Sequence, residues 1–150
     1  MVRLAPEKRR EVMRRIRSRG TGPELEIMKI LDEMGVRYTY QAKLDLGGRK
    51  RTVDFLIPDR GLVIEYRDCF WHWCPKCYGD SVPVRGGING REWWERKLRR
   101  NRERDRELER LLKEHGLRLV VIWRHDRKRM REIIEEALVG CPCDGRRNYL

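Results

Sequence analysis

The stretch TVDFLIPDRGLVIEYRDCFWHWCPKC, Thr52–Cys77, contains the residues around which the rest of the chain is organised. Two short apolar runs, Thr52–Ile57 and Leu62–Tyr66, predict neighbouring strands joined by a turn with proline and glycine. Asp54 lies in the first run and Glu65 near the end of the second, so both carboxylates are expected at one end of a small sheet. Carboxylate oxygens suit Mg²⁺, and Mg²⁺ suits phosphate chemistry. The stretch therefore predicts a nuclease active site.

Composition sets the expected partner. The 150 residues predict a single domain over 1–150, with a basic N-terminal helix within 1–20 and an irregular tail at 139–150. Thirty-six Lys and Arg against 24 Asp and Glu leave a net charge of +12, which favours nucleic acid ahead of an anionic membrane surface. A thermophile-like surface rich in ion pairs is the alternative, but paired charges alone would not leave this excess.

The chain shows no apolar run near 18 residues and no apolar signal-peptide core, so no membrane partner and an intracellular, cytoplasmic location are expected. Thiols stay reduced there, and the cysteines are expected to be metal ligands or buried thiols rather than disulfides. The five are Cys69, Cys74, Cys77, Cys141 and Cys143.

The order of elements predicts an α/β fold with a mixed sheet covered by helices on both faces. Expected helices cover residues 6–18, 21–34, 92–115 and 127–138, the last capped by Asp126; expected strands cover 36–41, 52–57, 62–66 and 117–123, and 44–51 is a basic hairpin connection. In the first helix, Arg14 and Arg15 either face solvent or lie along DNA. In the second, Glu24 either caps the helix or helps to hold the water shell of a metal.

The arrangement Asp54…Glu65-Tyr66-Arg67 resembles the PD-(D/E)XK signature of restriction-like nucleases. Arg67 takes the place of the usual lysine and, because it stays protonated, would stabilise negative charge rather than act as a base. His72 follows a few residues later and is expected to act as a general acid or base; the alternative is a structural histidine.

Aromatic residues surround His72. Consecutive aromatics at a strand end cannot all face inward, so Phe70 and Trp71, next to Trp73, are expected to wedge between DNA bases, with Trp93 or Trp94 as a further wedge. In the long charged helix, Lys97 and Asn101 are expected DNA contacts.

The pair Cys74-x-x-Cys77 is typical of half a zinc site. The residues that could complete this site are His125, Asp105, Cys141 and Cys143, with His115 a weaker candidate.

Cys69-Phe70-Trp71-His72, followed by Cys74-Pro75-x-Cys77-Tyr78, resembles the very-short-patch repair (Vsr) endonuclease family. Further matching motifs are Thr21-x-Pro23-Glu24, Val53-Asp54-Phe55, Trp94-x-x-Lys97, Asn101-x-x-Arg104-Asp105 and Val121-x-Trp123. The resemblance covers about residues 12–126. It implies a restriction-endonuclease-like fold, a structural zinc, and a Mg²⁺-dependent nick in duplex DNA at or beside a mismatch with aromatics intercalated there.

By this resemblance Asp54 binds the catalytic metal, His72 is the general acid or base, and Glu24 lies near the metal waters. The implied zinc ligands are Cys74, Cys77, Asp105 and His125, with His125 where the family usually has cysteine. The chain departs from the family in having Tyr66-Arg67 for Thr-His, Asp68 for glycine, and the extra carboxylate of Glu65.

We therefore expect a Mg²⁺-dependent endonuclease with Asp54 and Glu65 as metal ligands and His72, Arg67 and Glu24 as further catalytic residues. Double-stranded, mismatched DNA is the expected partner, with other repair proteins as further candidates, and the chain is expected to be a monomer or weak dimer. The alternatives are a restriction, homing or junction nuclease, and a zinc-stabilised DNA-binding protein without catalysis.

Overall fold

The computed structural model describes residues 5–8 and 22–139. Most of the expected first helix, with Arg14 and Arg15, lies outside these residues, as do Cys141 and Cys143. The described elements are α2 (Gly22–Glu33), β1 (Thr39–Leu46), β2 (Arg49–Ile57), a 3₁₀ turn at Pro58–Arg60, β3 (Leu62–Arg67), α3 (Pro75–Tyr78), α4 (Arg91–Glu114), β4 (Arg118–Trp123), a 3₁₀ segment at Arg124–Arg129, and α5 (Met130–Val139).

The strands form one mixed sheet in the order β1-β2-β3-β4. The pairs β1–β2 and β2–β3 are antiparallel, whereas β4 joins β3 in parallel after the long crossover through α4. The expected mixed α/β sheet is confirmed.

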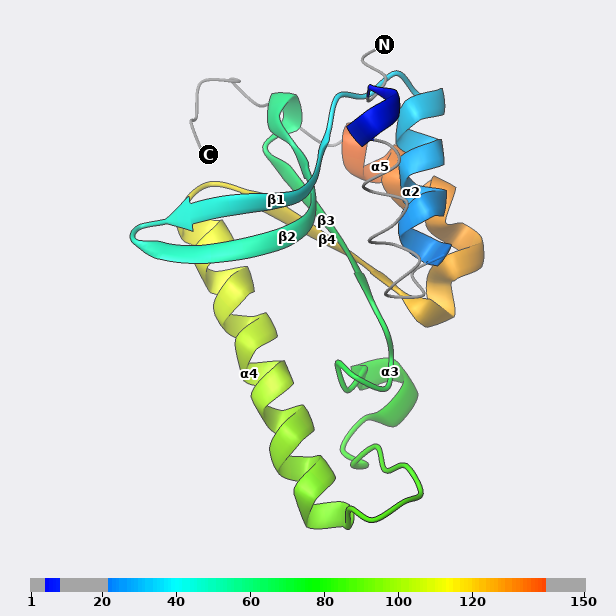
Figure 1. Ribbon diagram of the computed structural model, residues 1–150, viewed down its shortest axis with the longest axis vertical. Coiled ribbons are helices and arrows are strands. Elements are labelled where there is room, and N and C mark those ends of the chain that lie inside the picture. Colours follow the sequence, from blue (N-terminus) through cyan, green and yellow to red (C-terminus); the bar gives the residue numbers. More distant parts are fainter. Residues whose placement is uncertain (1–4, 9–21, 140–150) are drawn as a thin grey trace.

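Helices cover both faces of the sheet (Figure 1), with α2 and α5 on one face and α4 on the other. Alternate strand residues therefore enter two separate cores: Phe55 and Ile64 pack towards α2 and α5, while Leu56 and Val63 pack towards α4. The long helix reaches well beyond the sheet, and the segment around α3 lies opposite its lower half (Figure 1).

Two expected boundaries are corrected. The strand predicted at 36–41 begins later and continues through the expected basic connection, because Gly47 and Gly48, with φ of 67° and 87°, make the β1–β2 turn compact. The final helix does not start at Asp126: residues 124–129 form 3₁₀ turns, and α5 begins only at Met130, whose side chain is buried.

The sheet is irregular around Asp54. By the β1–β2 register its partner would be Gln41, yet the pairs run from Tyr40↔Phe55 directly to Ala42↔Val53. Gln41 has φ of 47°, an uncommon value for a residue other than glycine. On the other side, the β2–β3 ladder extends no further than Phe55↔Ile64. The backbone thus leaves the regular ladder at Asp54 on both sides.

Candidate active site and metal centre

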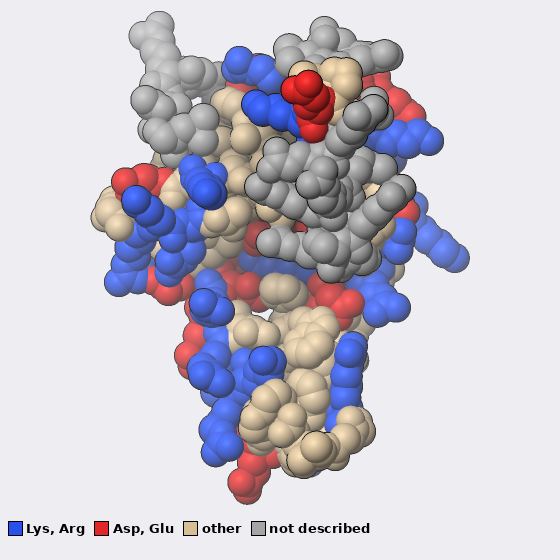
Figure 2. Space-filling model, viewed as in Figure 1, with Lys and Arg blue, Asp and Glu red and all other residues tan. Residues whose placement is uncertain are grey.

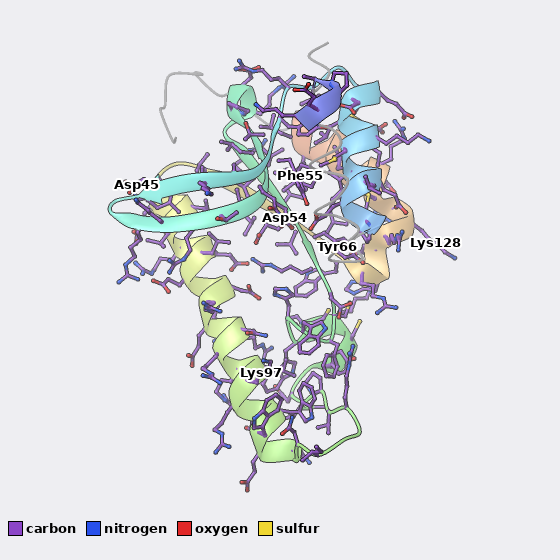
Figure 3. All side chains as sticks on the ribbon, in the orientation of Figure 1. Asp45, Asp54, Phe55, Tyr66, Lys97 and Lys128 are labelled. Carbon is purple, nitrogen blue, oxygen red and sulfur yellow. The ribbon has the colours of Figure 1, made fainter. Side chains whose placement is uncertain are left out.

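The pairing of β2 with β3 ends just before Asp54 and Glu65, and this places both carboxylates near the centre of the molecule. Beyond Phe55↔Ile64 the next position on each strand is Asp54 and Glu65, and the Asp54 carboxylate takes the place of a backbone partner by accepting a hydrogen bond from the Tyr66 N–H at 3.0 Å. Figure 3 shows Asp54 and Tyr66 where these strands separate. The predicted meeting of Asp54 and Glu65 at one end of the sheet therefore has a structural basis in the end of this ladder.

Burial and crowding of negative charge raise the pKa of Asp54 from 3.8 to about 7, with burial first and the Glu65 carboxylate second. The pKa of Glu65 is raised mainly by burial, against the opposing effect of Arg67. Two partly buried carboxylates that resist ionisation are a receptive site for a divalent cation, because the cation would neutralise both.

Glu24 joins this group from α2. Its side chain is buried, the Tyr40 hydroxyl donates a hydrogen bond to it, and its charge contributes to the raised pKa of Asp54. We call Glu24, Asp54 and Glu65 the carboxylate centre. These contacts place Glu24 beside Asp54, which simple helix capping would not require.

His72 lies next to Asp105, a residue that the sequence had suggested as a zinc ligand. Its Nδ1 lies 2.8 Å from Asp105 Oδ2 of α4. A histidine held at Nδ1 keeps Nε2 as the nitrogen that can exchange a proton, and the carboxylate stabilises the charged ring. The His72–Asp105 pair therefore has the geometry of an oriented general base or acid.

Arg67 does not face an open cleft. Its residue exposure is 3%, and carboxylates of Glu65, Asp105 and Glu109 surround its guanidinium. The sequence-based role of Arg67, a cation beside the attacking water, requires access that this burial does not provide.

Four potential ligand atoms for a second metal lie within 4.8 Å of one another. They belong to Cys69, Cys74, Cys77 and His125, which we call the cysteine cluster. His125 Nδ1 lies 3.3 Å from the sulfurs of Cys69 and Cys77 and 3.5 Å from that of Cys74. Three thiols and one imidazole around one point suit a tetrahedral Zn²⁺ site.

This set differs from the predicted zinc ligands in one position: Asp105 lies with His72, and Cys69 lies with Cys74, Cys77 and His125. Cys69 follows directly on β3, and the turn that begins there brings it back over Cys74, whose N–H donates to the Cys69 carbonyl at 2.8 Å. Burial and the neighbouring thiols raise the pKa of Cys69 to about 12.

The aromatic side chains divide into buried and exposed ones. Phe70, Trp73 and Trp94 pack with Leu98 in a small core, while Trp71 is 36% exposed and Trp93, from the start of α4, is 37% exposed. Of the residues predicted as wedges, Trp71 and Trp93 therefore lie at the surface in this structure. The rings of Phe70 and Trp94 pack against that of Trp71, with centroids 5.2 Å and 5.9 Å away.

Cations lie against these rings. The Arg85 guanidinium lies 4.0 Å from the Phe70 ring centroid and 5.0 Å from that of Trp71, and Lys97 Nζ lies 5.3 Å from that of Trp93. Asn101, which is also a predicted DNA contact, donates to the Trp71 carbonyl at 2.9 Å. That bond fixes the loop next to His72 onto α4.

Figure 2 shows Lys and Arg along both flanks of the lower half of the molecule, on either side of an uncharged surface. Exposed arginines of α4, including Arg96, Arg100 and Arg104, recur every four residues and so share one side of the helix. Among the described residues, no helix is long and apolar enough to cross a membrane.

Sequence reasoning missed three features of this region: the grouping of Cys69 with the other cluster residues, Asp105 as the partner of His72, and the turn contact of Asp68. The Asp68 carboxylate accepts the Phe70 N–H at 2.9 Å and lies 3.3 Å from Arg124. An aspartate two residues before a loop N–H is a turn signal that the sequence does contain. The pairing of Asp105 depends on how α4 packs, which no local pattern encodes.

A family model described as DNA mismatch endonuclease Vsr matches residues 1–78. The chain is 36% identical over 121 residues to the type II nicking enzyme V.XorIIP of Xanthomonas oryzae pv. oryzae, covering 81% of this chain and 82% of that protein. It is 32% identical over 126 residues to the DNA mismatch endonuclease Vsr of Escherichia coli, covering 84% of this chain and 75% of that one. A type II nicking enzyme of Neisseria meningitidis serogroup C, V.NmeDIP, is 32% identical over 127 residues, covering 84% of this chain and 80% of that enzyme.

Proposed function

This chain belongs to the Vsr family of DNA mismatch endonucleases and is an endodeoxyribonuclease with a restriction-endonuclease-like fold, and from this premise we propose that it cuts duplex DNA in a Mg²⁺-dependent reaction at or beside a mismatched base. One relative is named as a mismatch endonuclease and two as nicking enzymes, which supports a cut in one strand.

The carboxylate centre fits a hard divalent cation. Asp54 and Glu65 are the proposed ligands, because each is a partly buried carboxylate whose pKa is raised by burial and because their charges face one another. Mg²⁺ bound there would stabilise the negative charge that develops on the phosphate during hydrolysis.

The remaining chemistry falls to His72. With Nδ1 held by Asp105, its Nε2 takes a proton from the attacking water or returns one to the leaving oxygen. Glu24, which is hydrogen-bonded by Tyr40, is proposed to orient water at the carboxylate centre.

A structural Zn²⁺ is proposed in the cysteine cluster. Its ligands would be Cys69, Cys74, Cys77 and His125. His125 follows β4 directly, whereas the thiols belong to the segment after β3, so the ion would tie these two strand ends together and with them the loop that carries His72.

One observation carries the proposal: the short segment 68–77 brings His72 to Asp105 and, one residue earlier, presents Trp71 at the surface. An exposed indole next to the general base is suited to stack on bases beside the phosphate that is cut. A mismatched pair costs less to unstack than a matched one, so stacking there favours mismatched DNA.

The test uses labelled duplexes that are identical except for one base pair: matched, T·G, U·G or another mismatch. Each is incubated with the full chain and Mg²⁺, and products are resolved on denaturing and native gels. We expect one strand of a mismatched duplex to be cut and the matched duplex to stay intact. His72→Ala is expected to lower the rate by about 10²–10⁴-fold.

Equal cutting of all duplexes would contradict mismatch selection and favour a restriction-type nuclease, the reading that the second carboxylate, Glu65, supports. Breaks in both strands on the native gel would contradict nicking. Activity that persists in EDTA would contradict the Mg²⁺ requirement. Mass photometry of the protein alone and with DNA tests the proposed monomer or weak dimer.

A further inference from the structure

Arg67 links two parts of the active site that come from different elements. On β3, Glu65 and Arg67 lie two residues apart and so point to the same face, towards α4. On α4, Asp105 and Glu109 are four residues apart and so also share a face. The guanidinium lies between these two pairs of positions.

The contacts of Arg67 are specific to each nitrogen. Its Nη2 donates to Glu65 Oε1 at 3.1 Å, its Nη1 lies 3.5 Å from Glu109 Oε1, and its Nε lies 3.9 Å from Asp105 Oδ1. The second oxygen of Asp105, Oδ2, is the one that holds His72 at 2.8 Å. One side chain therefore reaches both a proposed metal ligand and the carboxylate that orients the proposed general base.

Burial separates Arg67 from the substrate. Its side chain is 4% exposed, against 32% for His72. Its Nε also has no hydrogen-bond partner among the residues that the structure describes, although it points towards Asp105. A buried N–H without a partner is costly, so closer approach of Asp105 to Nε would lower the energy of the site.

We propose that Arg67 is a positioning residue that holds Glu65 and the His72–Asp105 pair in register with one another, rather than a group that touches the phosphate. This inference rests on the proposed function of the same site. Arginine suits the role because its planar fork addresses several carboxylates at once, whereas the ammonium of lysine is a single point charge.

The test is a double-mutant cycle on the single-turnover rate of cutting a mismatched duplex. Arg67→Met is expected to lower the rate by about 10–100-fold and to leave DNA affinity without Mg²⁺ within about twofold, because the buried side chain does not contact DNA. In an Asp105→Asn background the same change is expected to cost less than about threefold, since the register between Glu65 and the His72–Asp105 pair no longer matters once that pair is weakened.

Arg67→Lys serves where the methionine variant fails to fold, because it keeps the charge. It is expected to lower the rate at least about tenfold, since lysine cannot serve three carboxylates together. Arg110→Met is the matched control: Arg110 lies on α4 beside Glu109, but its partner is Glu114 on the exposed side, and its loss is expected to leave the rate within about twofold. Circular dichroism and zinc content check the fold of each variant.

Three results would overturn the inference: independent, multiplying effects of the Arg67 and Asp105 changes, a loss of DNA affinity as large as the loss of rate, or wild-type rates for Arg67→Lys. All three are read against a wild-type protein that cuts. If the wild-type protein cuts no duplex, the proposed function itself fails. If the wild-type protein cuts but the effects of the two mutations are independent, only the inference about Arg67 fails.

Discussion

The carboxylate centre and the cysteine cluster are only a few residues apart along the chain, but the protein builds them in different ways. Asp54 and Glu65 project from strands at the point where a ladder ends, so the sheet fixes their backbones. The three cysteines belong to the segment after β3, which holds only the four-residue helix α3, and the histidine follows a different strand. The first site is fixed by the fold, whereas in the second the proposed ion would fix the backbone that carries its ligands.

The difference predicts opposite effects of mutation. Loss of a ligand from the carboxylate centre should remove activity and leave the fold intact, and loss of a ligand from the cysteine cluster should weaken the fold itself. Four experiments test this contrast.

The largest effect is expected for Asp54→Asn. Without a charged oxygen ligand the rate of cutting should fall about 10³-fold or more, the equivalent of several kcal/mol of lost charge stabilisation. Single-turnover assays on a mismatched duplex measure it. Asp45→Asn is the matched control, because Asp45 lies in the β1–β2 hairpin, where its carboxylate accepts the Gly48 N–H. Similar losses for both variants would break the contrast.

The next effect is expected for Cys74→Ser. Because the binding energy of a structural ion is folding energy, the free energy of unfolding should fall by roughly 3 kcal/mol or more and bound zinc should be lost. Thermal melts and metal analysis measure the two quantities. A chelator should bring the wild-type melting temperature down towards that of the variant and leave the variant unchanged. A variant with the stability of the wild type would contradict the structural role.

A smaller effect is expected for Trp71→Ala. If its indole stacks on bases, affinity for a mismatched duplex should fall about tenfold or more, since stacking is worth roughly 1–3 kcal/mol per base. Affinity for a matched duplex should change less, as fluorescence anisotropy would show. Trp93→Ala is the control, because Trp93 is exposed to the same degree and Lys97 lies over its ring. A larger loss of affinity for Trp93→Ala than for Trp71→Ala would indicate that Trp93, rather than Trp71, stacks on the bases.

The smallest effect concerns pH. The pKa of Asp54 is about 7 in the folded protein, above its ordinary value of 3.8, so the folded state binds the extra proton between these values. Without added Mg²⁺, stability should therefore be higher near pH 5 and should fall as pH rises through 7, by roughly 1–2 kcal/mol after allowance for solvent near the carboxylate.

Urea denaturation at several pH values measures this loss. The Asp54→Asn variant should show a smaller decrease over the same range, and added Mg²⁺ should oppose the decrease in the wild-type protein. A wild-type curve that is flat or that rises between pH 5 and 8 would contradict the raised pKa.

The sequence was informative where structure is regular. The strands around Asp54 and Glu65 and the helix over 92–115 follow from apolar period and turn residues, and the observed β2, β3 and α4 lie close to them. The proximity of the two acids could be predicted because a short turn joins their strands.

The contacts of the irregular segment 68–77 could not be predicted from local sequence patterns in the same way. Whether Cys69 or Asp105 completes the cysteine cluster depends on a turn that folds the chain back by five residues and on the position of α4 relative to that turn. The burial of Phe70, Trp73 and Trp94 follows from the same packing. The burial of Arg67 depends on Asp105 and Glu109, which lie about 40 residues further along the chain.

Helix α4 connects nearly every part of this site. Trp94 packs among the aromatic side chains, Asn101 holds the Trp71 carbonyl, Asp105 holds His72, and Glu107 pairs with the β1–β2 hairpin through Arg51. From Trp94 to Asp105 the helix rises about 16 Å at 1.5 Å per residue. One rigid helix thus sets the spacing between the buried aromatic core and the carboxylate that holds His72. In the proposed reaction, a movement of α4 along its axis would therefore displace the support of Trp71 and the proton-transfer pair together.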